Sequence, residues 1–156
     1  MRLVFWAGFW AFIVDQASKY LVVHALNLQD LQRIEVLPPV LNFHMAWNRG
    51  VNFGLFADDS TWSRWILIAI AFAISAFVYY WVQKDRPEKL GMIAAGLLIG
   101  GALGNVVDRL LYGAVADFLN MSCCGIDNPY AFNVADISIF AGALGLAFWG
   151  GEKKQA

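Results

Sequence analysis

The chain has 156 residues, of which 60% are hydrophobic and 15% are charged, and its mean hydropathy is +0.55. This length fits one domain, and this composition excludes an ordinary soluble globular protein. The net charge of -1 offers no basic surface for nucleic acid. The only two cysteines are the neighbours Cys123 and Cys124, and both histidines lie far from them in sequence. A zinc site therefore has no clustered ligands.

The first predicted element is an apolar helix over residues 3–26, which contains Asp15 and Lys19. A signal peptide also begins with a charge and an apolar run. The apolar character resumes after Lys19, however, so we expect a retained transmembrane helix. The two charges are four residues apart with the acid first, which places them on one helix face. We interpret them as a structural ion pair turned into the bundle rather than as catalytic groups, because pairing lowers the cost of charge in lipid.

The next segment, residues 27–60, is too polar to span a membrane and contains the helix-stopping pair Pro38 and Pro39. Apolar and polar residues alternate over 41–48, and the alternation continues at positions 51, 53 and 55. Alternation with a period of two residues predicts a strand in a small sheet at the membrane surface. We interpret His44 as a solvated strand residue. Asn48 fits both a turn and a substrate contact, and the sequence leaves these open.

Two further apolar runs, 62–83 and 90–112, are long enough to cross a bilayer. The second contains Gly96, Gly100 and Gly104, a ridge of small residues that lets helix backbones approach closely in lipid. We therefore expect this helix to pack tightly against its neighbours.

Three polar residues near the end of that helix, Asn105, Asp108 and Arg109, share one face because of their spacing. A buried interhelical network and a functional role are both open for them. Arg109 is expected to reach a partner on another helix or loop. Gly113 suits the left-handed residue that follows a helix end.

The second outer loop, residues 113–132, and the last predicted helix, 133–150, each contribute one acid. Asp117 lies in the loop between apolar neighbours, which suggests a dry setting rather than a plain surface position. Asn133 fits a helix N-cap, with Asp136 as its capping-box partner. Asp117 and Asp136 thus flank the same loop and can meet on one side of the membrane.

The basic residues predict the orientation of the chain. Six of the eleven fall in the N-terminus, the connection between the second and third helices, and the C-terminal tail: Arg2, Lys84, Arg86, Lys89, Lys153 and Lys154. The positive-inside rule makes that side cytoplasmic, with both termini inside and the two acids at the outer face.

Two acids at one apolar rim indicate a pair that shares a single proton, because two like charges at close range cannot easily both ionise. Such a pair performs aspartic peptidase chemistry without a metal or cofactor. An alternative is a small proton- or ion-translocating protein that uses Asp15, Asp108 and Asp136 as relay steps. A relay needs titratable groups across the full membrane depth, and the inner halves of the last three helices carry none. A structural membrane subunit with capped helices is a third possibility.

The motifs together resemble lipoprotein signal peptidase (signal peptidase II), and the resemblance spans almost the whole chain. Five segments in this order carry it: Asp15-Gln16-Ala17-Ser18-Lys19, Asn48-Arg49-Gly50-Val51-Asn52-Phe53-Gly54, Gly100-Gly101-Ala102-Leu103-Gly104-Asn105-Val106-Val107-Asp108-Arg109, Val115-Ala116-Asp117-Phe118 and Phe132-Asn133-Val134-Ala135-Asp136.

The resemblance implies an all-α membrane protein of four transmembrane helices, with a small β-rich extracytoplasmic cradle in the first outer loop. It implies one integral membrane domain over 1–156 in the bacterial inner membrane, acting as a monomer among membrane lipids. The substrate would be a prolipoprotein, cut just before its diacylglyceryl-modified cysteine, with the acyl chains in an apolar groove between helices. By motif, Asp117 and Asp136 would be the catalytic acids. Asn48, Asn105, Asp108, Arg109 and Asn133 would support them or contact substrate.

Overall fold

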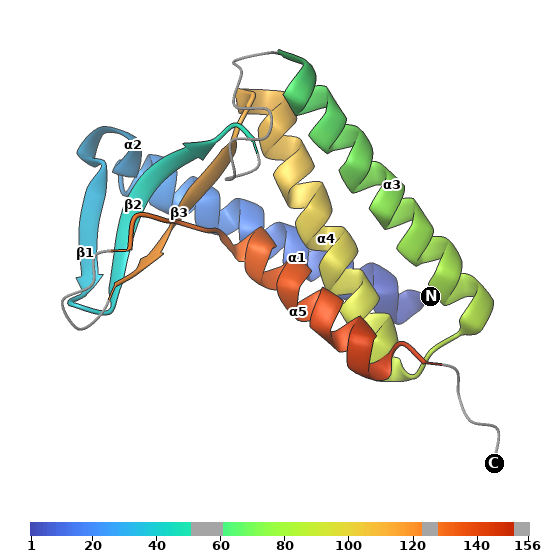
Figure 1. Ribbon diagram of the computed structural model, residues 1–156. Coiled ribbons are helices and arrows are strands. Elements are labelled where there is room, and N and C mark those ends of the chain that lie inside the picture. The colour runs from blue at the N-terminus through green and yellow to red at the C-terminus, as the bar shows by residue number, and fades with distance from the viewer. Residues whose placement is uncertain (51–60, 123–127, 152–156) are drawn as a thin grey trace.

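The computed structural model describes residues 1–50, 61–122 and 128–151. Helices form one end of the molecule and a small sheet forms the other (Figure 1). The elements in chain order are α1 (Arg2–Lys19), the π-helix η1 (Tyr20–Ala25), α2 (Leu28–Leu31), β1 (Arg33–Leu37), β2 (Leu41–Asn48), α3 (Thr61–Asp85), α4 (Lys89–Tyr112), β3 (Val115–Met121) and α5 (Val134–Trp149).

Helix α4 lies at the centre of the helical part and packs against α1, α3 and α5. The predicted ridge of small residues forms its contact with α1. A Cβ atom at Gly96 would lie 2.5 Å from the carbonyl oxygen of Val4, and one at Gly100 would overlap the backbone of Gly8. Side chains at these positions would force the two helices apart, so glycine sets their close approach.

Helices lie over all four apolar runs of the sequence, with differences at their ends. The first one continues to residue 25 but changes from α-helix to π-helix at Tyr20. Among the described residues, α3 and α4 are the two helices that are long and apolar enough to cross a membrane. Helix α1 carries three charged residues within its eighteen, and α5 has only sixteen residues.

The sheet corrects the sequence-based prediction. Its strands are antiparallel in the order β1-β2-β3, and β2 is the strand expected at 41–48. Residues 115–121, expected to be loop, form β3, so the sheet draws on both outer loops and not on the first alone. β3 pairs with β2 from Leu41 opposite Met121 to Asn48 opposite Val115. That pairing between distant segments is what orders the second loop as a strand.

The alternation in β2 is also less regular than expected. The β2–β3 register shifts between Phe43 and Ala46, and after this irregularity Trp47 is 37% exposed although it belonged to the predicted apolar face. A bulge of this kind re-aims side chains. His44 is exposed, as predicted. The expected continuation of the strand at 51, 53 and 55 lies outside the described residues.

A small apolar core fixes the sheet to the end of the first helix. Val22 and Val23 of η1 pack with Met45 of β2 and with Ala116 and Phe118 of β3. Ala116 and Phe118 are the neighbours of Asp117. The core therefore fixes the position of Asp117 relative to the helices.

Candidate active site

Asp117 is a buried acid on the central part of β3, with only 3% of its surface exposed. Both of its oxygens accept hydrogen bonds from asparagine amides. Asn48 Nδ2, at the end of β2, donates to Oδ2 at 3.1 Å, and Asn133 Nδ2 donates to Oδ1 at 2.6 Å. The setting is dry, as the apolar neighbours in the sequence suggested.

Asp136 occupies the third position of α5 and completes the predicted capping box. Asn133 Oδ1 accepts from the Asp136 backbone N–H at 2.9 Å, and Asp136 Oδ2 accepts from the Asn133 backbone N–H at 3.2 Å. The second carboxylate oxygen, Oδ1, accepts from Asn105 Nδ2 of α4 at 2.9 Å. Asp136 therefore caps a helix and belongs to a polar network between helices.

Asn133 links the two acids. It is fully buried, and its side-chain amide donates both to Asp117 Oδ1 and, at 3.2 Å, to Asn105 Oδ1. Its backbone N–H holds Asp136 at the same time. One residue at the start of α5 thus positions a carboxylate from β3 and another from its own helix.

The electrostatic environment favours a proton on Asp117. Burial and then the negative charge of Asp136 raise the pKa of Asp117 from 3.8 to about 7, and the amides of Asn48 and Asn133 and the charge of Lys19 oppose this rise. A buried acid next to a second carboxylate keeps its proton because ionisation would place two like charges in a poorly solvated site.

Lys19 joins two buried acids at the base of this network. Its Nζ lies 2.8 Å from Asp15 Oδ2 and 2.7 Å from Asp108 Oδ2, and it donates to Asn105 Oδ1 at 3.2 Å. The predicted pair of Asp15 and Lys19 is therefore present, as part of a three-residue cluster that also holds Asp108. Lys19 connects the cluster to Asp136 through Asn105.

Asp15 also ties α1 to the beginning of α5. Its Oδ1 accepts from the backbone N–H of Ala135 at 2.8 Å. This N–H belongs to the first turn of α5, where no intrahelical acceptor exists. A negative charge at this position also interacts favourably with the helix dipole. These contacts make Asp15 a structural anchor for the helix that carries Asp136.

Asp108 performs a similar task for the sheet. Besides Lys19, its Oδ2 accepts from the backbone N–H of Ala116 in β3 at 3.2 Å. Its Oδ1 accepts from Gln16 Nε2 at 3.1 Å. Asp108 thus fixes the strand residue that precedes Asp117 to α4 and α1.

Gln16 is a site residue that the sequence-based reasoning did not select. Its Nε2 lies within hydrogen-bonding distance of Asp15 Oδ2, of the Gly104 carbonyl oxygen and of Asp108 Oδ1. The sequence did hold a signal for Gln16, because an amide side chain beside Asp15 in an apolar helix needs hydrogen-bond partners.

Arg109 differs from its expectation. Its Nη1 donates to the Asn105 carbonyl oxygen of its own helix at 3.3 Å, and within residues 1–50, 61–122 and 128–151 it has no hydrogen bond to another element. Its buried Nε has no hydrogen-bond partner among the described residues. The negative charges that act on it are those of Asp136, Asp117 and Asp108. Arg109 therefore lies near both acids and has an N–H group that donates no hydrogen bond within the described part of the chain.

Hydrogen bonds or ion pairs connect all nine residues selected from the sequence into one network at the sheet end of the helices. The network contains Asp15, Lys19, Asn48, Asn105, Asp108, Arg109, Asn133, Asp117 and Asp136. Cys123 and Cys124 lie outside the described residues. Among the described residues, no three His, Cys, Asp or Glu side chains are grouped so that they could hold a metal ion.

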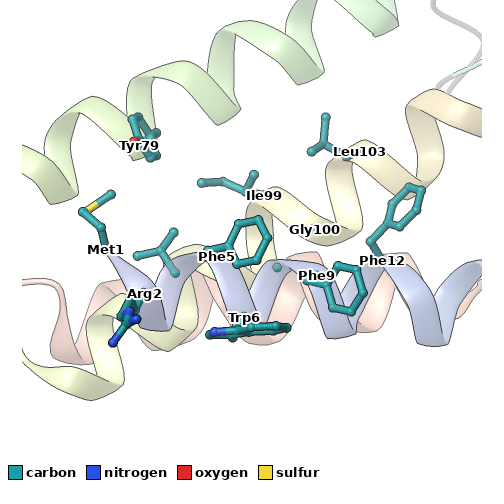
Figure 2. Close-up of a pocket in the computed structure, with 12 residues that line it drawn as sticks. Met1, Arg2, Phe5, Trp6, Phe9, Phe12, Tyr79, Ile99, Gly100 and Leu103 are labelled. Atoms are coloured by element: carbon teal, nitrogen blue, oxygen red, sulfur yellow. The ribbon is translucent and has the colours of Figure 1, made fainter.

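An apolar groove of about 750 Å³ lies between α1, α3 and α4 (Figure 2). Neither Asp117 nor Asp136 lines it. The expected apolar groove between helices for the acyl chains of the substrate stays a prediction, because this groove shares no lining residue with the two acids.

Comparison with known proteins points to one family. Residues 8–150 match the family model described as signal peptidase (SPase) II. The chain is 41% identical over 154 residues to the lipoprotein signal peptidase of Alteromonas mediterranea, covering 96% of this chain and 82% of that protein. It is 40% identical over 153 residues to the lipoprotein signal peptidase of Aeromonas hydrophila, covering 96% of this chain and 90% of that one.

Solved structures show a similar fold. Two structures, both described as a bacterial membrane enzyme determined by the in meso method, have a TM-score of 0.76 and 29% sequence identity. Each match covers 93% of this chain, together with 85% of one solved chain and 90% of the other.

Proposed function

Because this chain belongs to the signal peptidase II family, we propose that Asp117 and Asp136 form the catalytic pair with which it cleaves its substrates. The protein is a peptidase of bacterial membranes that removes signal peptides from prolipoproteins. The observation that carries the assignment of the pair is Asn133, which binds Asp117 through its side chain and Asp136 through its backbone.

The two acids take different roles in this proposal. Asp117 holds the single proton, because burial and the charge of Asp136 raise its pKa to about 7. Asp136 is the carboxylate that accepts a proton from the attacking water. Asp117 donates its proton to the oxygen of the scissile carbonyl as the water oxygen bonds to the carbon. Collapse of the resulting gem-diol, with proton transfer to the leaving nitrogen, breaks the C–N bond.

The surrounding residues position this pair. Asn48 and Asn133 fix the orientation of Asp117, and Asn105 fixes that of Asp136. Arg109 is only partly buried, and the charges of Asp136 and Asp117 act on it, so we assign to its guanidinium group a hydrogen bond to the substrate backbone near the scissile bond. Fixed donors of this kind avoid reorganisation during the reaction.

The site suits a substrate that is attached to the membrane surface. We propose that α1 with η1, α3, α4 and α5 all span the inner membrane, with both termini in the cytoplasm. The sheet and the acids then lie at the periplasmic face. A diacylglyceryl-modified cysteine would hold the cleavage point at that depth. The enzyme would act as a monomer and without a cofactor.

The alternative, a proton or ion relay, is less well supported. Asp15 and Asp108 are both paired with Lys19, which leaves no chain of free titratable groups along the described helices. A structural subunit would need no acid that keeps its proton near neutral pH.

A cleavage assay tests the proposal. Wild-type protein, D117N and D136N would be purified in detergent and given a diacylglyceryl prolipoprotein, and release of the signal peptide would be measured. We expect each variant to lose at least about 10³-fold in kcat, since the pair acts as a unit. The matched control is D30N, which removes an exposed acid of α2. A folded D117N or D136N variant that keeps a tenth of the wild-type rate would remove that residue from the pair.

A further inference from the structure

We propose that the groove between α1 and α3 binds an anionic phospholipid of the cytoplasmic leaflet, with an acyl chain in the groove and the headgroup near Arg2. The inference uses the proposed membrane orientation but does not depend on the catalytic pair.

The lining of the groove fits a hydrocarbon chain. The side chains along it are almost all apolar, and Arg2 has the only charged side chain among the residues that line it. Figure 2 shows Phe5, Phe9 and Phe12 of α1 on one side of this space and Tyr79 of α3 on the other. The groove has a volume of about 750 Å³ and is open along one side, so a hydrocarbon chain can enter it from the surrounding bilayer.

The length of the groove selects a lipid over a protein helix. Its lining along α1 and the N-cap of this helix runs from Met1 to Phe12, which corresponds to about 16 Å at a rise of about 1.5 Å per residue. One leaflet of the hydrocarbon core is about 15 Å deep, whereas a spanning helix needs about 30 Å. The groove is therefore one acyl chain long and too short to hold a transmembrane segment along its full length.

The position of the groove around α4 separates it from the candidate active site. Ile99 and Leu103 line the groove, whereas Asn105 and Arg109 belong to the network around the two acids. At about 100° per residue, these two pairs point in directions that differ by roughly 120° around α4. A substrate held at the acids would approach a different face of α4, so the groove is free for a lipid.

The charge at the end of the groove selects an anionic headgroup. Arg2 begins α1, is exposed, and forms no ion pair with any described residue. The first turn of α1 contains no acidic residue that would repel an anion. Figure 2 shows Arg2 at the Met1 end of the groove, with its side chain pointing away from α3. A long flexible side chain at this place can turn toward a phosphate at the end of the groove. Basic groups at the cytoplasmic end of a pocket between helices favour anionic lipids.

Lipid titration of the intact detergent-solubilised protein tests this inference. Phosphatidylglycerol and phosphatidylcholine with identical chains would be added, and bound lipid would be counted by native mass spectrometry. We expect one phosphatidylglycerol to bind about fivefold more tightly than phosphatidylcholine, and R2Q to remove that preference. L103W should fill the groove and abolish tight binding of both lipids, and I99W serves the same purpose if L103W does not fold.

Matched controls separate the groove from general surface effects. K89Q removes an exposed charge at the same end of the helices, and L110W enlarges an exposed residue of α4 outside the groove. Both should bind lipid like the wild type, as should D117N, so failure of the catalytic proposal would leave this result unchanged. In the prolipoprotein assay, L103W should keep the wild-type KM.

Four results would overturn the inference. Equal binding of the two lipids by the wild type would remove the role of charge, and equal losses in R2Q and K89Q would show a diffuse surface effect. Tight binding retained by groove-filling variants would place the lipid elsewhere. A KM raised more than about fivefold in L103W would assign the groove to the signal peptide.

Discussion

The stability of D117N relative to the wild type should change sign with pH. The pKa of Asp117 rises from 3.8 to about 7 on folding. The folded state therefore keeps a proton that the unfolded chain releases between about pH 4 and 7, and the wild type loses stability as the pH rises through this range. Each pKa unit corresponds to about 1.4 kcal/mol, so the loss reaches roughly 4 kcal/mol at pH 8.

Asparagine at position 117 removes this pH-dependent loss of stability but lowers stability by an amount that does not depend on pH. In the wild type, both Asp117 oxygens accept from amide donors, Asn48 Nδ2 and Asn133 Nδ2. The new amide offers only one oxygen, so one donor faces another donor, which costs about 1–3 kcal/mol. D117N should then be less stable than the wild type at pH 4 by this amount. It should be more stable at pH 8 by a similar amount, with a crossing between about pH 4.5 and 6.

Unfolding in detergent measures the effect. The seven tryptophans allow equilibrium unfolding to be followed by fluorescence from pH 4 to 8 for both proteins. Groups that titrate equally in both proteins do not contribute to the difference between their free energies of unfolding. D30N measures how much the removal of an exposed carboxylate changes the free energy of unfolding. If the difference stayed constant over this range, or if the wild type gained on D117N as the pH rose, Asp117 would not be the group that holds the proton.

The same geometry supports four further predictions. The kcat/KM for prolipoprotein cleavage should fall above about pH 7, because Asp117 then loses the proton that it donates; a rate that rises from pH 6 to 9 would contradict this role. D15N should lower stability by roughly 2 kcal/mol. The hydrogen bond from the Ala135 N–H to residue 15, at 2.8 Å in the wild type, becomes weaker, whereas the ion pair between Lys19 and Asp108 remains. Its kcat at a permissive temperature should change little, and a lost rate with unchanged melting would argue for a direct role. G104A should lower the free energy of unfolding by roughly 3 kcal/mol in the same unfolding experiment, because the added Cβ would lie 2.5 Å from Asp15 Oδ2. Stability equal to that of the wild type would mean that α1 and α4 can separate freely. Chelators should leave the rate unchanged because the two acids supply both proton transfers, and inhibition that added metal reverses would require a metal in the mechanism.

The elements with local causes could be predicted from the sequence. Runs of apolar residues located the helices, and the spacing of Asp15 and Lys19 predicted their ion pair, which forms at 2.8 Å. The Asn133 cap with Asp136 was likewise readable, because a capping box depends on residues three apart. Gly113 ends α4 in the left-handed conformation expected of it, with φ +77°. In each case the interacting groups lie within a turn or two of one another, so the local sequence contains the whole interaction.

Contacts between distant segments required the tertiary structure. Residues 115–121 appeared to be a loop because their apolar and polar order has no clear period, and only pairing with β2 makes them a strand. The attachment of Lys19 to Asp108 and the double role of Asn133 join α1, α4, β3 and α5, which no spacing within one segment can reveal. The sequence alone determined where the four long helical segments lie and which two acids flank the outer loop, whereas the π-helical turn η1 and the short α2 were not predicted. The tertiary structure decided how those acids are held, because side-chain contacts between distant segments depend on packing rather than on local pattern.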